Sequence, residues 1–254
     1  MAITIKSERE IELMAEAGKI LERVHNELEK ALHPGMSTKD IDTLGEEIIR
    51  SYGCIPSFLN YNGYPASICV SVNQEVVHGI PDKHRIIHEG DIVSLDAGVI
   101  YKGYHSDAAR THAVGEVSEE AKKLIQVTKE CFFEGIKYAK AGNHLFDISG
   151  AIGRYAEERG YGVVRDLCGH GIGTALHEAP EIPNYEVGRK GVKLRPGMTL
   201  AIEPMINIGT HEVDWLDDDW TVVTRDGSLS AHYENTILIT EGEPRILSLT
   251  CDNE

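Results

Sequence analysis

The N-terminal part of the chain carries apolar residues at helical spacing. They recur every three or four positions, as Ile11, Met14, Gly18, Leu21, Val24 and Leu28. This period places them on one face of an α-helix. Ser7 and Glu10 form a capping-box pattern just before the stretch. The pattern predicts a helix that starts near Ser7 and packs one face inward. His25 lies at the margin of that face, where we expect a surface or boundary histidine.

Shorter runs of β-branched and apolar residues predict strands, and two of these runs carry an aspartate. Ile92–Leu95 leads into Asp96, and Asp107 follows the next turn. We read the two runs as one hairpin centred between Tyr101 and Lys102. That centre predicts that Asp96 and Asp107 lie directly opposite each other. Two like charges in that position repel unless a cation lies between them.

Three more potential metal ligands stand in apolar or glycine-rich surroundings. Glu203 lies within the apolar stretch Thr199–Ile206, Glu234 precedes the strand-like run Asn235–Thr240, and His170 is flanked by glycines. A buried carboxylate without a partner is unfavourable by several kcal/mol or shifts its pKa upward. A positive charge should therefore compensate these groups.

Charge balance indicates what the five residues would hold together. Four carboxylates cancel the charge of two divalent ions, and neutral His170 adds one nitrogen donor. Oxygen-rich ligation with a single imidazole suits manganese, iron(II), cobalt or catalytic zinc better than a structural zinc, and the sequence leaves these four metals open. Two such ions can share a water molecule, lower its pKa and polarise a carbonyl, so the ligand set predicts a hydrolase.

The chain contains an internal repeat with an interval of 107 residues. Gly35, Asp40, Ile41, Gly53 and Gly90 recur 107 positions later as Gly142, Asp147, Ile148, Gly160 and Gly197. The same interval relates Asp96 to Glu203. We interpret each half as a turn, a helix (about 37–51 and 145–159) and a strand with a ligand carboxylate. Two halves, at about 7–112 and 118–249, would then meet at the metals.

Length, charge and cysteine content restrict the remaining possibilities. The 254 residues fit one catalytic domain over 1–254, and the sequence has no run approaching the roughly 18 apolar residues of a membrane span. The net charge of −16 argues against binding to nucleic acid or to an anionic membrane. Five cysteines without a secretion signal are expected to be reduced thiols of a cytoplasmic protein.

Together these motifs resemble those of the type I methionine aminopeptidases. The matching residues follow the order and spacing of that family over nearly the whole chain, as His78-Gly79-Ile80-Pro81, Asp96, Asp107, Gly169-His170-Gly171-Ile172-Gly173, His177-Glu178, Ile202-Glu203-Pro204 and Tyr233-Glu234. The resemblance implies the α+β pita-bread fold, in which two pseudo-symmetric halves with antiparallel sheets flanked by helices surround a dinuclear metal centre. It also implies removal of the initiator methionine from nascent proteins whose second residue is small and uncharged.

The resemblance divides the five ligands between two metal ions. Asp96 would chelate one ion, Asp107 and Glu234 would bridge both, and His170 with Glu203 would complete the other site. We also assign Glu203 as general base, because an apolar strand raises the basicity of a carboxylate.

His78 and His177 are the other two residues expected to take part in catalysis and substrate binding. The family places one near the scissile amide nitrogen and the other near the developing oxyanion, where a donor contributes roughly 2 to 4 kcal/mol. Without the resemblance, a structural role for either histidine is an equal alternative. The resemblance also places a methionine pocket between His78 and the residues Phe58, Tyr61, Tyr64, Cys69 and Trp220. Aromatic rings and a thiol suit a thioether, although such a stretch alone favours core packing.

Three positions depart from some members of the family. Phe58 is bulky where a small residue can stand, Leu176 replaces an aromatic residue, and Gly98 lacks a hydroxyl that some relatives place beside the metal. The pocket width and the metal preference are therefore open.

Two other functions are alternatives. Xaa-Pro aminopeptidases and prolidases use a similar ligand set but usually carry a large extra N-terminal domain, and a non-catalytic peptide-binding protein of this fold is expected to have lost ligands. Type II aminopeptidases have a helical insertion for which the span from Met205 to Glu234 leaves little room. We therefore expect a monomeric metalloaminopeptidase acting on N-terminal methionyl peptides and nascent chains, with the ribosome as a candidate partner.

Overall fold

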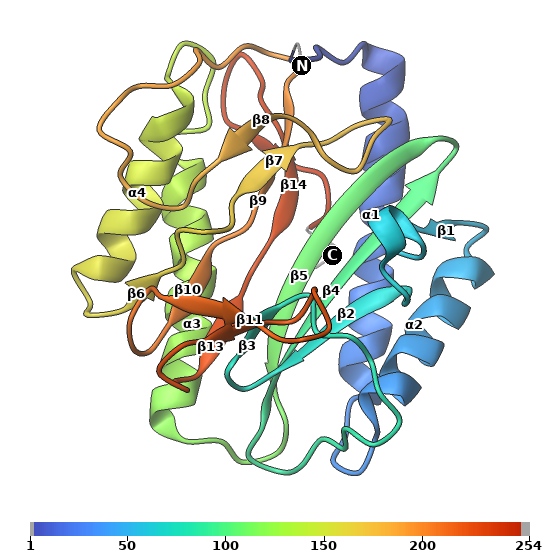
Figure 1. Cartoon of the computed structure of the whole chain (residues 1–254). Helices are drawn as coiled ribbons and strands as arrows, with labels where there is room; N and C mark the ends of the chain where they lie inside the picture. Colours follow the sequence, from blue (N-terminus) through green and yellow to red (C-terminus); the bar gives the residue numbers. More distant parts are fainter. Residues whose placement is uncertain (1–2, 250–254) are drawn as a thin grey trace.

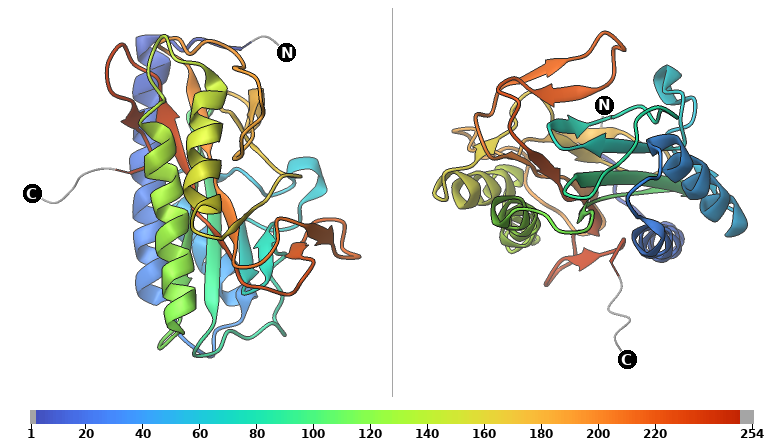
Figure 2. Two further views of the ribbon diagram at one scale, coloured as in Figure 1. Left: turned by 90° about the vertical axis from the view of Figure 1, so that its left-hand side faces the viewer. Right: turned by 90° about the horizontal axis from the view of Figure 1, so that it is seen from below.

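The computed structural model describes residues 3–249, in which the helices form a layer on one side of several antiparallel sheets (Figures 1 and 2). The helices are α1 (Glu8–Ala31), α2 (Thr38–Ser51), α3 (Glu119–Ile136) and α4 (Leu145–Glu157), with a short 3-10 helix η1 (Tyr61–Gly63). None of the helices in this part of the chain is long and apolar enough to cross a membrane. The thiols of Cys54, Cys69, Cys131 and Cys168 are unpaired, and Cys251 lies outside the described residues.

The strands form four sheets. The first sheet has the strand order β1 (Ile55–Pro56), β4 (Ile92–Tyr101), β2 (Ile68–Val72), and β5 (Tyr104–Ala113) also pairs with β4. The five-stranded sheet has the order β15 (Arg245–Ile246), β14 (Asn235–Leu238), β9 (Thr199–Ile202), β7 (Gly169–Gly171), β8 (Glu178–Ile182). Two smaller sheets have the orders β13 (Ser230–His232), β10 (Met205–Asn207), β6 (Gly162–Val163) and β11 (Val213–Trp215), β12 (Val222–Thr224), β3 (Glu75–Val77). All strand pairs are antiparallel, which confirms the α+β prediction.

Helix α1 confirms the predicted N-terminal helix. Its buried residues include five of the six positions on the predicted face, namely Met14, Gly18, Leu21, Val24 and Leu28. The backbone N–H of Ser7 donates to Glu10 Oε2 at 2.7 Å, as the capping box predicts. The expectation for His25 is wrong: this side chain is buried because β5 packs against that side of α1, and its Nε2 bonds the Ala108 carbonyl at 2.8 Å.

Strands β4 and β5 form the predicted hairpin around a tighter turn than expected. Tyr101 pairs with Tyr104, which leaves only Lys102 and Gly103 in the loop. Both loop residues have positive φ, 49° and 86°. Positive φ at both positions is the requirement of a type I′ turn, whose twist matches that of the flanking strands.

This turn changes the pairing of the two aspartates. Because the hairpin is centred between Lys102 and Gly103, Asp107 pairs with Gly98 and Asp96 pairs with Ala109. The prediction that Asp96 and Asp107 lie directly opposite each other is therefore wrong. They are diagonal neighbours two positions apart on the same face of the hairpin, where side chains can still interact.

The 107-residue repeat has a counterpart in the structure. Helices α2 and α4 begin and end within two residues of the predicted ranges. Isolated β-bridges join Ser37 to Ile86 in front of α2 and His144 to Lys193 in front of α4, and both partners of the second bridge lie 107 positions after those of the first. Each helix therefore starts at the same kind of bridged turn.

Separate hydrophobic clusters fill the two halves. One packs α1 and α2 against β2 and β4 and includes Leu21, Ile49 and Leu95. The other packs α3 and α4 against β9 and β14 and includes Phe132, Ile152 and Leu200. A third cluster includes Phe58, Tyr64 and Leu176 and lies at the cavity that contains the candidate site.

Candidate active site

A cavity of about 280 Å³ is lined by every residue that the sequence predicted for the site. The predicted metal ligands on its wall are Asp96, Asp107, His170, Glu203 and Glu234, and the predicted catalytic and pocket residues are His78, His177, Phe58, Tyr61, Tyr64, Cys69 and Trp220. The first group comes from both halves of the chain, which explains why no single motif could reveal the arrangement.

Strand pairing brings the acidic residues of the second half together. Because Asn235 of β14 pairs with Ile202 of β9, the next residues along, Glu234 and Glu203, fall side by side at the end of that pair. His170 pairs with Ala201 on the other side of β9.

Backbone and hydroxyl hydrogen bonds attach this group to the first hairpin. The N–H of Glu234 donates to the carbonyl of Ala109 at 3.0 Å. The hydroxyl of Thr236 accepts from the backbone N–H of Asp107 and donates to its carbonyl, both at 2.9 Å. These contacts place Asp107 beside Glu234.

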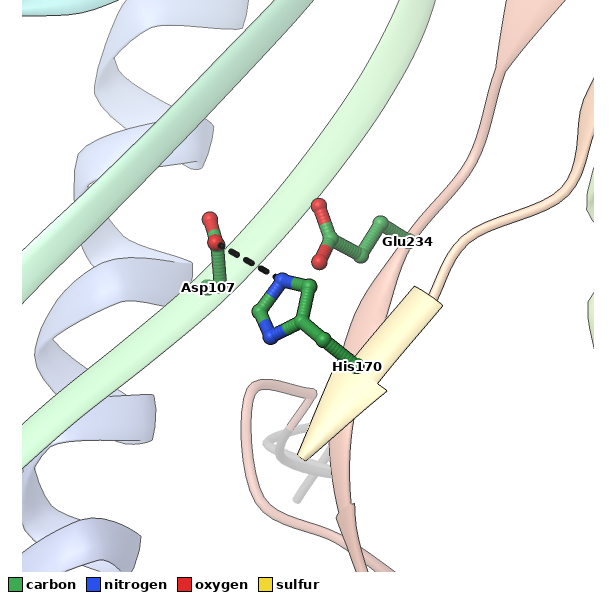
Figure 3. A group of neighbouring side chains, drawn as sticks. All are labelled: Asp107, His170 and Glu234. Atoms are coloured by element: carbon green, nitrogen blue, oxygen red, sulfur yellow. Dashed lines mark ion pairs between the residues drawn. The ribbon is translucent and has the colours of Figure 1, made fainter. Parts of the chain in front are cut away.

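Three of the five side chains lie within reach of a single ion. Asp107, His170 and Glu234 offer ligand atoms within 4.8 Å of one another, and Figure 3 shows the three side chains converging from β5, β7 and the start of β14. His170 Nε2 is 3.8 Å from Asp107 Oδ2 and 3.6 Å from Glu203 Oε1. Asp96 is the diagonal neighbour of Asp107 on the hairpin, and an interaction between the two carboxyl groups contributes to the raised pKa of Asp96.

Burial dominates the electrostatics of this cluster. It raises the pKa of Asp107 to about 7 and the pKa of Asp96, Glu203 and Glu234 well above the usual range, and the neighbouring carboxylates raise the last three further. Burial lowers the pKa of His170 to about 3, so this imidazole is neutral at pH 7.

The carboxylate oxygens of this cluster are the right donors for divalent cations. One buried oxygen on each of Asp96, Asp107 and Glu234 has no hydrogen-bond partner. A buried carboxylate without a partner is strongly unfavourable, and lowering its energy requires a proton or a cation. Oxygen-rich ligation with one neutral imidazole fits the ions that the sequence predicted.

Two residues that the sequence patterns did not identify lie beside the predicted ligands. Arg110 is half-buried and lies over the Tyr233 ring, and its guanidinium donates to the backbone carbonyl of Glu234 and to Asn235 Oδ1 rather than to the ligand carboxylates. His232 Nε2 lies 3.7 Å from Glu203 Oε2. Arg110 stands three residues after Asp107, and His232 stands two residues before Glu234. This proximity to predicted ligands is the only sign of their role in the sequence.

The two predicted catalytic histidines are neutral and held by aromatic side chains. His177 Nδ1 and the Tyr61 hydroxyl are 2.7 Å apart, and the His177 ring lies 4.2 Å from that of His170. His78 has a left-handed φ of 60°, and its ring meets the edge of Trp220. Burial lowers the pKa of His78 to about 4 and also lowers that of His177.

The rest of the cavity wall is largely apolar. The Tyr64 hydroxyl donates to the Gly79 carbonyl at 2.9 Å, and its ring packs against Trp220 in the cavity wall. Six wall residues were not predicted, namely Asn62, Val77, Asp166, Leu167, Cys168 and Met205. Several adjoin predicted residues in the sequence, but nothing in their own pattern marks them.

Known proteins resemble this chain over most of its length. The profile of metallopeptidase family M24 matches residues 12–241. A methionine aminopeptidase of Clostridium acetobutylicum is 58% identical over 247 residues, which cover 97% of this chain and 99% of that protein. The crystal structure of a methionine aminopeptidase from Thermotoga maritima has a TM-score of 0.96 and 47% identity and covers 98% of this chain and 100% of that chain. An Xaa-Pro dipeptidase of Bacillus anthracis shares the fold, with a TM-score of 0.78 and 27% identity, but this chain covers only 62% of it.

These findings make the chain a metallopeptidase of family M24 and confirm the predicted pita-bread fold. Within that family it belongs to the methionine aminopeptidases, as the resemblance of its motifs implied.

Proposed function

We propose that this chain removes N-terminal methionine from polypeptides whose second residue is small and uncharged. One observation carries the proposal: a single cavity joins two buried carboxylates, two half-buried carboxylates and a neutral imidazole to an apolar wall of aromatic rings and a thiol. The carboxylate side suits hydrolysis of a peptide bond, and the apolar side suits a thioether. The names of the relatives agree with this activity.

We propose two divalent ions as cofactors, drawn from manganese, iron(II), cobalt and zinc. Asp96 would hold one ion, Asp107 and Glu234 would bridge both, and His170 and Glu203 would hold the other. When bound, such ions polarise the scissile carbonyl and lower the pKa of a water molecule. Four carboxylates would then be balanced by four positive charges, which offsets the repulsion that, after burial, raises the pKa values of Asp96, Glu203 and Glu234.

Glu203 is the proposed general base. Its carboxylate lies between His170 and His232, at 3.6 Å and 3.7 Å, and its surroundings raise its pKa, which favours proton uptake. It would take a proton from the attacking water and deliver it to the leaving amine.

The two neutral histidines would orient the substrate. A Tyr61 hydroxyl that donates to His177 Nδ1 leaves the proton of that imidazole on Nε2, where it can donate to the substrate. His78 has a left-handed backbone conformation, and its ring packs against Trp220 beside the apolar wall. One of the two would meet the scissile amide and the other the developing oxyanion, for which neutral donors are suited.

We further propose that the substrates are nascent chains in the cytoplasm and that the enzyme is a monomer. The ribosome is a candidate partner. The net charge of −16 favours contacts with basic surfaces over contacts with nucleic acid.

The test is release of free methionine from Met-Ala-Ser by protein stripped of metal and reloaded with each of the four ions. An Ala-Pro peptide is run beside it. Metal-dependent cleavage of only the methionyl peptide is the expected result, and the order of rates ranks the metals. Cleavage of only the proline peptide would indicate prolidase activity, and tight metal binding without cleavage of either would indicate a binding protein.

A further inference from the structure

Gly98 lies on β4 between the predicted metal ligands and the apolar wall of the cavity. It is two residues after Asp96 and pairs directly with Asp107, so a side chain at position 98 would project from the same face of the hairpin as both carboxylates. Gly98 is not among the residues with positive φ. The backbone conformation therefore allows any residue there, and the reason for glycine must be space.

The space beside Gly98 is filled by the segment that leads into η1. A Cβ atom at position 98 would lie 2.8 Å from Ser57 Cβ and 2.9 Å from Phe58 Cε1. Both distances are well inside van der Waals contact. The Phe58 ring is buried, 7% exposed, and lines the cavity. It thus occupies the volume that a side chain at position 98 would need.

Two hydrogen bonds hold this segment against β4. The backbone N–H of Ser57 donates to the Gly98 carbonyl at 2.9 Å, and the Ser57 hydroxyl bonds His105 Nδ1 on β5 at 3.0 Å. These bonds fix Ser57 at both its backbone and its side chain. The backbone of the next residue, Phe58, therefore cannot move away from β4 without breaking these hydrogen bonds.

We propose that Gly98 determines substrate specificity through Phe58, by allowing the ring to pack against β4 and to narrow the slot for the methionine side chain. This inference rests on the proposed aminopeptidase function. A narrow slot admits an unbranched side chain and excludes branched ones of similar volume. Gly98 touches neither substrate nor metal in this proposal and acts as a positioning residue for Phe58.

A substitution at either position should change selectivity in a defined direction. Phe58→Ala widens the slot, so kcat/KM for Leu-Ala-Ser relative to Met-Ala-Ser should rise about tenfold or more. Gly98→Ala inserts a methyl group between β4 and the ring and displaces the ring into the cavity. It should lower kcat/KM for Met-Ala-Ser about tenfold, mainly through KM, and affect the shorter norvalyl-Ala-Ser less.

The decisive measurement is the double-mutant cycle of Phe58→Ala and Gly98→Ala, read as the ratio of kcat/KM between the methionyl, norvalyl and leucyl peptides. If Gly98 acts through the ring, the double variant has the selectivity of Phe58→Ala alone. Additive changes in selectivity would overturn the proposal. So would a Gly98→Ala defect that follows weakened manganese binding, measured by calorimetry on each variant.

Two controls separate pocket shape from damage to the fold. Gly135→Ala inserts the same methyl group 2.6 Å from Ile152 between α3 and α4, and should reduce stability without changing selectivity. If Gly98→Ala does not fold, the double variant Ser57→Gly/Gly98→Ala takes its place. It removes the contact with Ser57 Cβ and leaves the contact with the Phe58 ring. Its selectivity is compared with that of Ser57→Gly alone. Equal changes for all three peptides in that variant would contradict the proposal. Wild-type protein that cleaves none of the peptides would reject the aminopeptidase function instead.

Discussion

The candidate active site and a second polar cavity differ in how their acidic groups are balanced. The second cavity, about 370 Å³ and here called the α1–α3 cavity, contains Glu22 and Glu29 together with Arg110 and Lys129. The described wall of the active-site cavity contains five acidic residues and no lysine or arginine. Both are rich in histidine. Only in the α1–α3 cavity do basic side chains of the chain itself balance the acidic charge. The excess of acidic residues, rather than the number of polar groups, therefore marks the site that requires metal.

The largest difference between the two cavities should appear when one carboxylate in each is replaced by its neutral amide. Glu203→Gln should lower kcat by about 10² to 10⁴, because it removes the proposed base while relieving repulsion in the metal-free protein. Its metal-free Tm should stay the same or rise. Glu29→Gln, in the α1–α3 cavity, should leave kcat unchanged. Equal activity of the two variants on Met-Ala-Ser would contradict the comparison.

A buried acid that already has a cation provides the next test. Lys6 Nζ lies 2.7 Å from Glu178 Oε2, with side chains 4% and 12% exposed. Lys6→Met should lower the free energy of unfolding by about 3 kcal/mol in urea, because Glu178 would lose its cation and keep only the hydrogen bonds from the Thr4 hydroxyl and the Ala175 N–H. The Lys122–Glu119 pair has the same 2.7 Å separation but is exposed, so Lys122→Met should leave the free energy of unfolding nearly unchanged. Similar losses in both variants would show that burial does not decide the outcome.

The metal-free protein should become less stable as pH rises. Burial raises the pKa of Asp107 from 3.8 to about 7, so the folded state binds more protons than the unfolded state between these values. The contribution of Asp107 to the free energy of unfolding is then fully present below pH 4 and is lost as pH rises through 7. Asp96, Glu203 and Glu234 act in the same direction. Buried histidines whose pKa values are lowered, such as His78, His170 and His232, act in the opposite direction below about pH 6.5. We therefore expect Tm to drop by at least about 5 °C between pH 7 and pH 9. Manganese should reverse the drop at pH 8; a metal-free Tm that rises over this range would contradict the assignment.

The smallest effect should come from a neutral hydrogen bond in the active-site cavity. Tyr61→Phe removes the hydroxyl that lies 2.7 Å from His177 Nδ1. Because such a bond contributes about 0.5 to 1.5 kcal/mol, kcat/KM for Met-Ala-Ser should fall by roughly 2- to 12-fold. Tyr155→Phe removes a hydroxyl that bonds Glu130 outside the cavity at 2.6 Å and should leave kcat/KM unchanged.

The sequence predicted what depends on local periodicity and on residue type. The apolar period and capping box located α1, and the repeat located α2 and α4 within two residues. The chemistry of Asp96, Asp107, His170, Glu203 and Glu234 was readable because charged groups in apolar strands need a partner. Their convergence was not, since it depends on pairing between strands that lie far apart in the chain.

The errors have a common physical origin in contacts that spacing alone does not encode. The hairpin register was wrong by one turn position, because only the positive φ of Lys102 and Gly103 reveals the type I′ loop. His25 was expected at the surface, because the helix period cannot show that β5 covers the margin of α1. Arg110 was missed because a lone arginine in a strand becomes informative only once its guanidinium is seen on the Glu234 carbonyl.

The position of the ligand cluster between two separate hydrophobic clusters affects how the protein unfolds. Asp96 and Asp107 are anchored in the hairpin that covers the cluster of α1 and α2, whereas His170, Glu203 and Glu234 are anchored in the sheet that covers the cluster of α3 and α4. Cations bound between them would cross-link the halves without a covalent bond. On metal loading, amide hydrogens in both clusters should then gain protection from exchange together. The free energy of opening one half would include the cost of releasing it from the other half.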